Sequence, residues 1–325
     1  MNPALSVVFL TTLIGAGQGL FVAMYVAQAG GAMGALPVQD GVRFYALGSA
    51  LSLLLLGGGL LASFFHLGHP ERAWRAVAMW RTSWLSREVI ALPAFMAAVF
   101  VYGALHYLGW NDNLFGAASP GGGWTYVAGG VGVLLCITLF VCTGMIYACI
   151  KFIEEWHTPF TLINFTLLGV ASGFVLATGF SAFAAPALVK FFGAWAITLT
   201  LVALIFRAAS LLRNKRIRHM SNLQTAIGVK HTKIQQKAQG AMGGSFNTRE
   251  FFHGKSALFL RSVKWIFLVL TFVAPVPLLW LALSSGAAAL FVLAHLVQFI
   301  GLIAERWFFF AQAKHPQNLY YQTIS

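Results

Sequence analysis

The fold is decided by one polar stretch, His66-Leu-Gly-His-Pro-Glu-Arg-Ala-Trp-Arg-Ala-Val-Ala-Met-Trp-Arg-Thr-Ser-Trp-Leu-Ser-Arg-Glu88, which separates two long apolar runs. Histidine, carboxylate and several arginines crowd together in it. If the flanking runs span a membrane, His66 ends one helix, Glu88 begins the next, and both lie at the same interface. Because ionisable groups at a membrane edge are costly to keep there, the stretch predicts a proton-handling site.

The composition is that of a protein embedded in a lipid bilayer. Of the 325 residues, 59% are hydrophobic and only 9% are charged, with a mean hydropathy of +0.78. A soluble domain carries roughly 25% charged residues. A hydrocarbon core of about 30 Å needs roughly 20 apolar residues in a helix. Eight segments qualify: 4–28, 42–66, 87–108, 124–150, 160–182, 186–211, 261–283 and 287–311. The sequence therefore predicts an all-α integral membrane protein, a bundle of eight transmembrane helices in a single domain over 1–325.

Two of these boundaries need an argument. The first run has no basic segment before it and is long enough to span, so we interpret it as a helix and not as a cleavable signal. The fifth and sixth spans are separated only by Ala184-Ala185-Pro186. Proline is common at the start of a helix, which favours a break there over a kink.

The net charge of +13 would suggest a nucleic-acid partner in a soluble protein. In a membrane protein, an excess of Lys and Arg instead marks the cytoplasmic loops, so no nucleic acid is expected. With eight spans both termini share one face, and of the 21 Lys and Arg residues all but Arg43 and Lys190 fall on that face. The prediction is a multi-pass protein of the cell inner membrane with both termini in the cytoplasm.

Segment 212–256 is the largest polar excursion and forms a basic cytoplasmic loop in this prediction. It carries nine Lys and Arg residues against the single acid Glu250, and it is too small and too poor in hydrophobic residues to fold alone. Two interpretations remain open. It is a solvated loop that touches anionic lipid headgroups, or it is a docking arm for a partner subunit.

His66 and Glu88 are the leading candidates for chemistry. Glu88 is expected in the first turn of the third helix, where Ser83 or Ser86 would form the cap. The helix dipole favours the ionised carboxylate and burial favours the neutral form, while His66 titrates near neutrality without help.

A quinone is the substrate that suits such a pair. Oxidation of a quinol releases two protons and two electrons from hydroxyls that need hydrogen-bond partners. A His and a Glu facing one pocket, with aromatic walls such as Trp74, Trp80 and Trp84, would supply them. The alternative is an interfacial anchor, because Trp and Arg at headgroup level are ordinary.

Metal centres have weaker support. His106 and His295 are expected at a similar depth and could clamp a b-type haem, but one pair without a second favours ordinary hydrogen-bonded histidines. His157 lies near Glu154 and Glu155, although no spacing demands a metal there. The three cysteines form no cluster-binding pattern. Four polar residues within the spans line a pocket or bond one helix to another: Gln18, Tyr25, Tyr102 and Gln298.

At these residues the sequence resembles the membrane anchor subunit (DmsC-like) of the dimethyl sulfoxide reductase family of molybdopterin oxidoreductases. The resemblance rests on His66-Leu-Gly-His-Pro-Glu-Arg-Ala-Trp-Arg75, on Arg81-Thr-Ser-Trp-Leu-Ser-Arg-Glu88 and on the closing block Glu305 to Tyr321. The number of spans extends it over the whole chain, although the insert at 212–256 is longer than expected for the shortest members.

The resemblance implies a membrane-anchor domain without enzymatic metal centres of its own. Its partners would be an iron–sulfur electron-transfer subunit and a molybdopterin catalytic subunit, besides membrane lipid. Ubiquinone or menaquinone would react near the docking face, with no covalent cofactor. The functional His and Glu of the family map onto His66 and Glu88, with Arg87, Arg72 and Arg75 in support, while Trp74 and Trp84 remain the candidate walls.

Orientation then bears on the substrate. If the docking face is cytoplasmic, the catalytic subunits are cytoplasmic too, which resembles the sulfite dehydrogenase branch that passes electrons to quinone. The alternative is the anchor of a dimethyl sulfoxide or other S- or N-oxide reductase that oxidises menaquinol. Outside this class stand a purely structural anchor and a secondary transporter. The transporter is disfavoured because the ionisable residues gather at helix ends and no internal repeat is found.

Overall fold

The computed structural model describes residues 1–110, 123–231, 233–235 and 251–320. Within them, eight helices are long and apolar enough to cross a membrane. They span Leu5–Ala32, Gly41–Phe64, Trp84–Tyr107, Trp124–Ala148, Pro159–Ala184, Pro186–Lys215, Ala257–Ser285 and Ala288–Ala311. The described part of the chain contains no β-strand. The predicted all-α, eight-span membrane bundle is confirmed.

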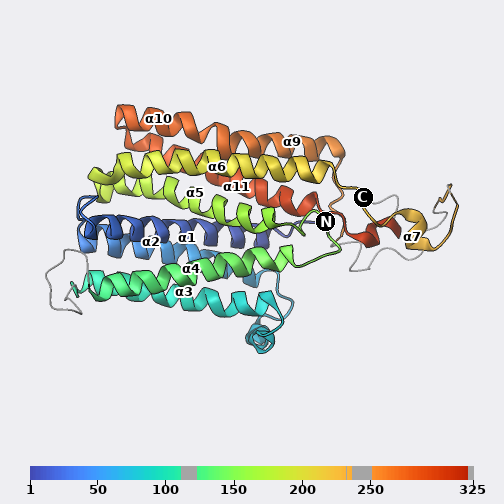
Figure 1. Ribbon diagram of the computed structural model, residues 1–325, viewed down its shortest axis with the longest axis horizontal. Coiled ribbons are helices and arrows are strands. Elements are labelled where there is room, and N and C mark those ends of the chain that lie inside the picture. The colour runs from blue at the N-terminus through green and yellow to red at the C-terminus, as the bar shows by residue number, and fades with distance from the viewer. Residues whose placement is uncertain (111–122, 232, 236–250, 321–325) are drawn as a thin grey trace.

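The elements follow one another along the chain as shown in Figure 1. Their bounds are α1 Leu5–Ala32, η1 Gly41–Ala46, α2 Leu47–Phe64, η2 Pro70–Met79, α3 Trp84–Tyr107, α4 Trp124–Ala148, α5 Pro159–Ala184, η3 Pro186–Leu188, α6 Val189–Lys215, α7 Leu223–Ile227, α9 Ala257–Leu268, η5 Val269–Val273, α10 Pro275–Ser285, α11 Ala288–Ala311 and η6 Pro316–Tyr320.

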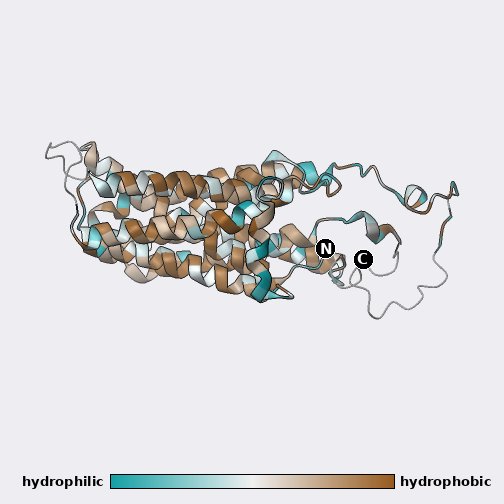
Figure 2. Cartoon of the chain, turned by 90° about the horizontal axis from the view of Figure 1, so that it is seen from below, coloured by the Kyte–Doolittle hydropathy of each residue, from teal (hydrophilic) through white to brown (hydrophobic). Residues whose placement is uncertain are grey.

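The bundle is organised around α1, which packs against α2, α4, α5 and α11. The α3–α4 pair lies on one side of it, and α6, α9 and α10 lie on the other (Figure 1). Both chain ends, η2 and α7 lie at one end of the bundle, which we call the terminal face. Hydrophobic residues dominate the length of the helices, and hydrophilic ones gather at the terminal face and beyond it (Figure 2). The N-terminus and the last described residues, which follow α11, thus lie at the same end of the bundle.

The contact between α1 and α5 depends on glycine. A Cβ atom built on Gly173 would lie 2.1 Å from the carbonyl carbon of Gly19, and one built on Gly19 would lie 2.3 Å from the carbonyl oxygen of Gly169. Only hydrogen fits at these positions. Small residues let the backbones of membrane helices approach closely, and here they hold the central helix against its neighbour.

Two helix ends near the polar stretch differ from the prediction. Helix α3 begins at Trp84, because the Ser83 side chain caps it by accepting a hydrogen bond from the Ser86 amide. Glu88 therefore lies in the second turn, and the first turn contains no acid. The expectation that the helix dipole acts on Glu88 is wrong, since that effect fades beyond the first turn. Helix α2 ends at Phe64, so His66 lies outside it.

The later boundaries are set by proline and by continued helix. The break before Pro186 is confirmed, with α5 ending at Ala184. Helix α6 continues to Lys215, so the predicted loop 212–256 begins as helix. The seventh span is interrupted by the π-helical segment η5, directly before Pro275, where the ring supplies no N–H donor. Part of the predicted loop, 236–250 with Glu250, and the end of the closing block at Tyr321 lie outside the described residues.

Candidate functional site

Glu88 points into the bundle. Its side chain is 9% exposed, and its Oε1 atom accepts a 2.5 Å hydrogen bond from the Thr143 hydroxyl of α4. A void of about 10 Å³ lies beside it, lined by Leu10, Thr11, Ile14, Gly15, Gln18, Glu88, Phe140, Thr143 and Phe165. This volume is roughly that needed for one water molecule, and the lining offers several polar partners. The carboxyl group is thus held in a small polar niche inside an apolar bundle.

A much larger groove runs along the outside of the same helix pair. It has a volume of about 430 Å³ and is lined by Trp80, Trp84, Arg87, Ile90, Ala91, Ala94, Leu135, Ile137, Thr138, Val141 and Cys142. Most of these side chains are apolar, and Arg87, Thr138 and Cys142 add polar groups. Binding sites for small organic molecules have this size and this mixture. Ile90 and Ile137 are exposed on the bundle surface, so the groove opens toward lipid.

Arg87 is the charged group of the groove, and its position is fixed. Its Nε atom donates to the Trp80 carbonyl at 2.9 Å and an Nη atom donates to the Arg81 carbonyl at 2.7 Å. The guanidinium lies 4.2 Å from the centroid of the Trp84 ring. A guanidinium carries five N–H donors, so these two bonds leave others that can serve a ligand. Arg87 and Glu88 are neighbours in sequence, yet one lines the groove and the other the interior void.

The remaining members of the predicted site lie on the surface of the terminal face. His66 and Trp74 are exposed, Trp74 to 70%, and neither lines the groove or the Glu88 void. Partial burial lowers the pKa of His66. Arg72 forms an exposed ion pair with Glu71 at 3.6 Å, and the Arg75 guanidinium lies 5.6 Å from the Trp74 ring centroid.

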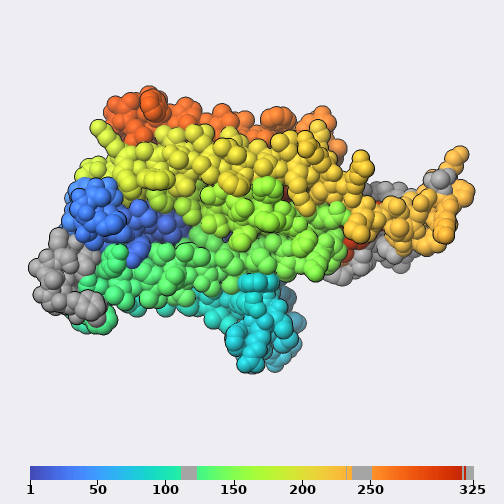
Figure 3. Space-filling model, in the orientation of Figure 1, coloured from blue at the N-terminus to red at the C-terminus, as the bar shows by residue number. Residues whose placement is uncertain are grey.

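These surface residues belong to η2 and its flanks. Figure 1 shows η2 end-on, with its axis across the bundle, and Figure 3 shows it as a bulge at the terminal face. Helices with Trp and Arg side chains lie in the plane of membrane interfaces. The predicted site is therefore divided into three layers: a surface helix, a lipid-facing groove with Trp80, Trp84 and Arg87, and the interior niche of Glu88.

The two histidines considered as haem ligands have separate surroundings. His106 stacks on Tyr45 with ring centroids 4.3 Å apart and meets Tyr102 edge-on at 4.6 Å. The ring contact of His295 is with Phe299, at 5.9 Å. No contact among the described residues joins the two histidines, so the haem alternative gains no support from their arrangement.

The third group of candidates, around His157, bonds to the backbone and to one further side chain. Nδ1 of His157 lies 2.7 Å from the Ala148 carbonyl, Glu154 accepts from the Met220 amide at 3.1 Å, and Glu155 pairs with His219 at 3.5 Å. Within the described part of the chain no three His, Cys, Asp or Glu residues are grouped as a metal site. These residues instead tie the α4–α5 loop to the segment after α6.

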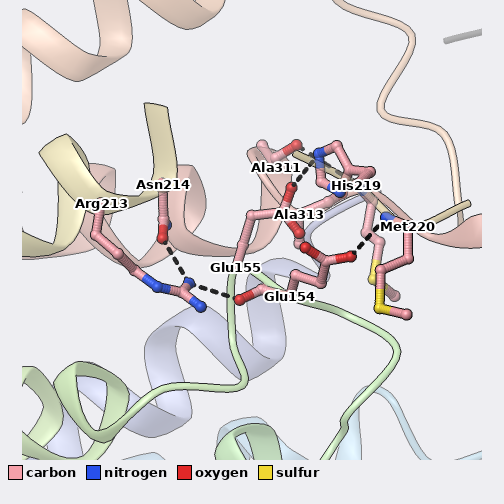
Figure 4. A network of polar contacts seen from close by, with 9 residues as sticks. Glu154, Glu155, Arg213, Asn214, His219, Met220, Ala311 and Ala313 are labelled. Atoms are coloured by element: carbon pink, nitrogen blue, oxygen red, sulfur yellow. Dashed lines mark hydrogen bonds and ion pairs between the residues drawn. The ribbon is translucent and has the colours of Figure 1, made fainter. Parts of the chain in front are cut away.

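That tie is part of a wider network at the terminal face (Figure 4). Arg213, near the end of α6, donates to the Glu154 carbonyl at 2.6 Å, and the Met1 amine donates to the Ala313 carbonyl at 2.9 Å. A cavity of about 370 Å³ adjoins the network, with Phe152, His219 and Lys314 among its lining. The network holds four separate parts of the chain together and gives this face a fixed, largely polar surface.

Sequence reasoning missed one buried charge. Arg207 lies inside α6 with its Nε atom 2.7 Å from Oε1 of Glu305, and both side chains are 1% exposed. Arg306 approaches the other oxygen, Oε2, at 3.4 Å. Glu305 therefore pairs with Arg306 of its own helix and with Arg207 of α6. A charge in the middle of an apolar run is the signal that would have identified Arg207.

The polar residues within the spans join helices. Gln18 donates to the Cys136 carbonyl at 3.0 Å, the Tyr102 hydroxyl donates to Gln28 at 2.9 Å, and Gln298 donates to Thr200 at 3.1 Å. Tyr25 packs against Tyr126, with ring centroids 5.4 Å apart. Gln18 alone among the four predicted polar positions also lines the Glu88 void.

Comparison with known proteins agrees with this arrangement. The family model described as DMSO reductase anchor subunit (DmsC) matches residues 1–312. A sulfite dehydrogenase subunit from Allochromatium vinosum is 56% identical over 327 residues, which cover 100% of both chains. The anaerobic dimethyl sulfoxide reductase chain YnfH of Escherichia coli is 28% identical over 124 residues, 38% of this chain and 40% of that one. The chain therefore belongs to the dimethyl sulfoxide reductase anchor subunits, multi-pass membrane proteins that anchor the catalytic and electron-transfer partners of an oxidoreductase complex.

Proposed function

We propose that this chain is the quinone-reactive anchor of a three-subunit molybdopterin oxidoreductase that oxidises sulfite and reduces quinone. The full-length identity of 56% with a sulfite dehydrogenase subunit carries the proposal. The groove beside α3 and α4 supports it, because its volume of about 430 Å³ and its apolar walls suit a quinone head group. The substrate of the complex is turned over in another polypeptide.

The chemistry assigned to the groove is a two-electron, two-proton reduction. A quinone receives two electrons from the docked iron–sulfur subunit and two protons from the aqueous side, and leaves as quinol. Arg87 donates a hydrogen bond to one carbonyl oxygen, while Trp80 and Trp84 pack on the ring. Glu88 lies behind the groove and supplies a proton through the α3–α4 seam, where Cys142 lines the groove and its neighbour Thr143 donates a hydrogen bond to Glu88.

The terminal face is the proposed docking surface. The iron–sulfur subunit binds there and carries the molybdopterin subunit, within tunnelling reach of the groove. The excess of Lys and Arg on this face favours a cytoplasmic position for it. The polar network of Glu154, Arg213 and Met1 offers a base on which a partner can dock. The exposed His66, Arg72 and Arg75 lie at the edge of this surface and are assigned to the docked complex.

Purification of the complex through a tag on this chain tests the proposal. Molybdopterin and iron–sulfur subunits should co-purify, and sulfite should reduce a soluble ubiquinone or menaquinone analogue. A catalytic partner that carries an export signal would reverse the orientation. Co-purification of the same subunits without any sulfite-dependent reduction of quinone would reject the assigned substrate.

A second candidate within the family is the anchor of an S- or N-oxide reductase that oxidises menaquinol. The partial match to the dimethyl sulfoxide reductase chain of Escherichia coli favours it, although that match covers 38% of the chain. The purified complex separates the two functions, since this candidate oxidises a menaquinol analogue with dimethyl sulfoxide as acceptor.

Replacing Arg87 by Ala is expected to weaken binding of a quinone-analogue inhibitor about 10- to 100-fold. A hydrogen bond from a charged group contributes about 1.5–3 kcal/mol, and each 1.4 kcal/mol is a factor of about ten in affinity. Inhibitor titration of the purified complex measures the effect. Arg81→Ala is the matched control, because the Arg81 side chain lies over Trp80 but does not line the groove. Equal losses in both variants would reject the assignment of Arg87.

A further inference from the structure

The buried ion cluster carries more positive than negative charge. Arg207 and Arg306 share the single carboxylate of Glu305, so two guanidinium groups and one carboxylate leave a net charge of +1. All three side chains are nearly inaccessible, with exposures of 1% for Arg207 and Glu305 and 5% for Arg306. An uncompensated charge in such a place is strongly unfavourable. The bundle should therefore contain a counter-charge nearby.

Glu88 is the other carboxylate in the described spans. Its niche and the ion cluster lie at similar depths. By helical rise, Glu88 is about 6 Å from the terminal-face end of α3, Glu305 about 9 Å from that of α11, and Arg207 about 12 Å from that of α6. The two sites thus belong to one polar layer of the bundle, close to the terminal face.

Two water-sized voids connect the sites. The Glu88 void is lined by Thr11, Gly15 and Phe165, and the same three residues line a second void of about 10 Å³. Arg306 lines this second void, together with Thr12 and Ser172. The Arg306 guanidinium lies 3.8 Å from the centroid of the Phe165 ring, so a single aromatic side chain borders both voids.

The second void has the properties of a hydration site. Nη1 of Arg306 is buried and has no hydrogen-bond partner among the described residues, and the hydroxyls of Thr12 and Ser172 offer further polar contacts. Buried waters typically make two to four hydrogen bonds to otherwise unsatisfied groups. One water in each void would join Arg306 to Glu88 by way of Thr11.

We propose that the Arg207–Glu305–Arg306 cluster is the counter-charge of Glu88 and acts on it through water held in the two voids. Ionised Glu88 brings the polar layer to a net charge of zero. The cluster stabilises the carboxylate that remains after Glu88 gives a proton toward the groove. Arg306 and Arg207 are positioning residues in this scheme. Their effect on turnover rests on the proposed quinone reaction, whereas their effect on the protonation of Glu88 does not.

The other groups around Glu88 do not replace this counter-charge. From α4, Thr143 donates to it, and the ionisable Cys142 and Tyr147 belong to the same helix. The α1 side chains that line its niche, Thr11 and Gln18, are polar but uncharged, and α2 and α5 contain no ionisable side chain. Arg87, on α3 itself, faces the groove, and the charged residues of η2 are exposed. Tyr147 stacks on Phe165 with ring centroids 5.4 Å apart, and the Arg306 guanidinium lies over the same Phe165 ring, which borders the Glu88 void.

The test is an infrared titration of Glu88 in the purified complex, with the carboxyl band assigned by its loss in Glu88→Gln. Removing one positive charge by Arg306→Gln should move the titration midpoint of Glu88 up by about one pH unit or more. Removing the negative charge by Glu305→Gln should move it down. Arg306→Lys keeps the charge and should restore most of the original midpoint. Opposite shifts from neighbouring substitutions distinguish an electrostatic effect from general damage.

A midpoint that stays unchanged in both Arg306→Gln and Glu305→Gln would overturn the counter-charge. If the Arg306→Gln protein does not accumulate, the Ser172→Val variant tests the proposal instead. The valine side chain fills the second void and removes a polar partner of the water held there. A midpoint raised by Ser172→Val supports the water link, and an unchanged one rejects it. Failure of the quinone assignment would appear separately, as a complex whose Glu88 titrates as expected but which does not reduce quinone.

Discussion

Replacement of Glu88 by Gln is expected to lower quinone-linked turnover by about 100-fold or more while the complex stays assembled. Glutamine has nearly the same shape and can still accept the hydrogen bond from Thr143, but it cannot carry a proton. Proton transfer by a positioned side chain contributes typically 10²- to 10⁴-fold to a rate. The loss should therefore fall on the proton-coupled step and leave the packing of α3 and α4 intact.

Two measurements separate this effect from failed assembly. Sulfite oxidation with an artificial electron acceptor reports on the partner subunits alone and should keep its rate. Glu71→Gln is the matched control, since Glu71 is an exposed acid on η2 and lines neither the groove nor the void. Wild-type quinone turnover in an assembled Glu88→Gln complex would show that Glu88 does not handle the proton.

Replacement of Gly173 by Val is expected to prevent the bundle from folding stably. A Cβ at this position would lie 2.1 Å from the Gly19 carbonyl carbon and 2.3 Å from the Gly19 Cα. Both are main-chain atoms of the central helix α1 and cannot turn aside as a flexible side chain would. Overpacking of an ordinary core costs about 1–3 kcal/mol, and here the two helices must move apart, so the loss should exceed that range.

Thermal unfolding of the detergent-solubilised chain, followed by its circular dichroism, measures this loss. Gly57→Val is the control, because Gly57 also lies in a span but no atom stands within 4 Å of a Cβ built on it. The control should unfold at nearly the wild-type temperature. A Gly173→Val protein as stable as Gly57→Val would contradict the close approach of α1 and α5.

The spans could be predicted from the sequence because each is a long apolar run of the length that a bilayer demands. The break between the fifth and sixth spans at Pro186 was predictable from local sequence, because proline has no N–H to continue a helix. The beginning of α3 was not, because Ser83 and Ser86 are both good caps and only the structure shows that Ser83 is the one used.

The division of the candidate site depended on packing. Arg87 and Glu88 are about 100° apart around a helix of 3.6 residues per turn, so they had to face different surroundings. Which of them faces inward is decided by α1 and α4, and no local pattern contains that information. The pairing of Arg207 with Glu305 joins α6 to α11 across a long stretch of chain. The sequence shows that a charge at Arg207 or Glu305 is unusual within an apolar span, but only the fold shows that the two residues pair.

The depth of the two carboxylates has an energetic consequence for the cell. Glu88 and Glu305 both lie in the turns near the terminal face, and the core beyond them is built from apolar and aromatic side chains such as Phe21, Phe95 and Leu20. A proton that reaches the groove from the terminal face thus crosses only a small part of the bilayer. In the proposed reaction, electrons from sulfite and the protons that follow them enter quinone from the same compartment, and this step would then generate no membrane potential. Any protonmotive force gained from sulfite would arise later, at the enzyme that reoxidises the quinol.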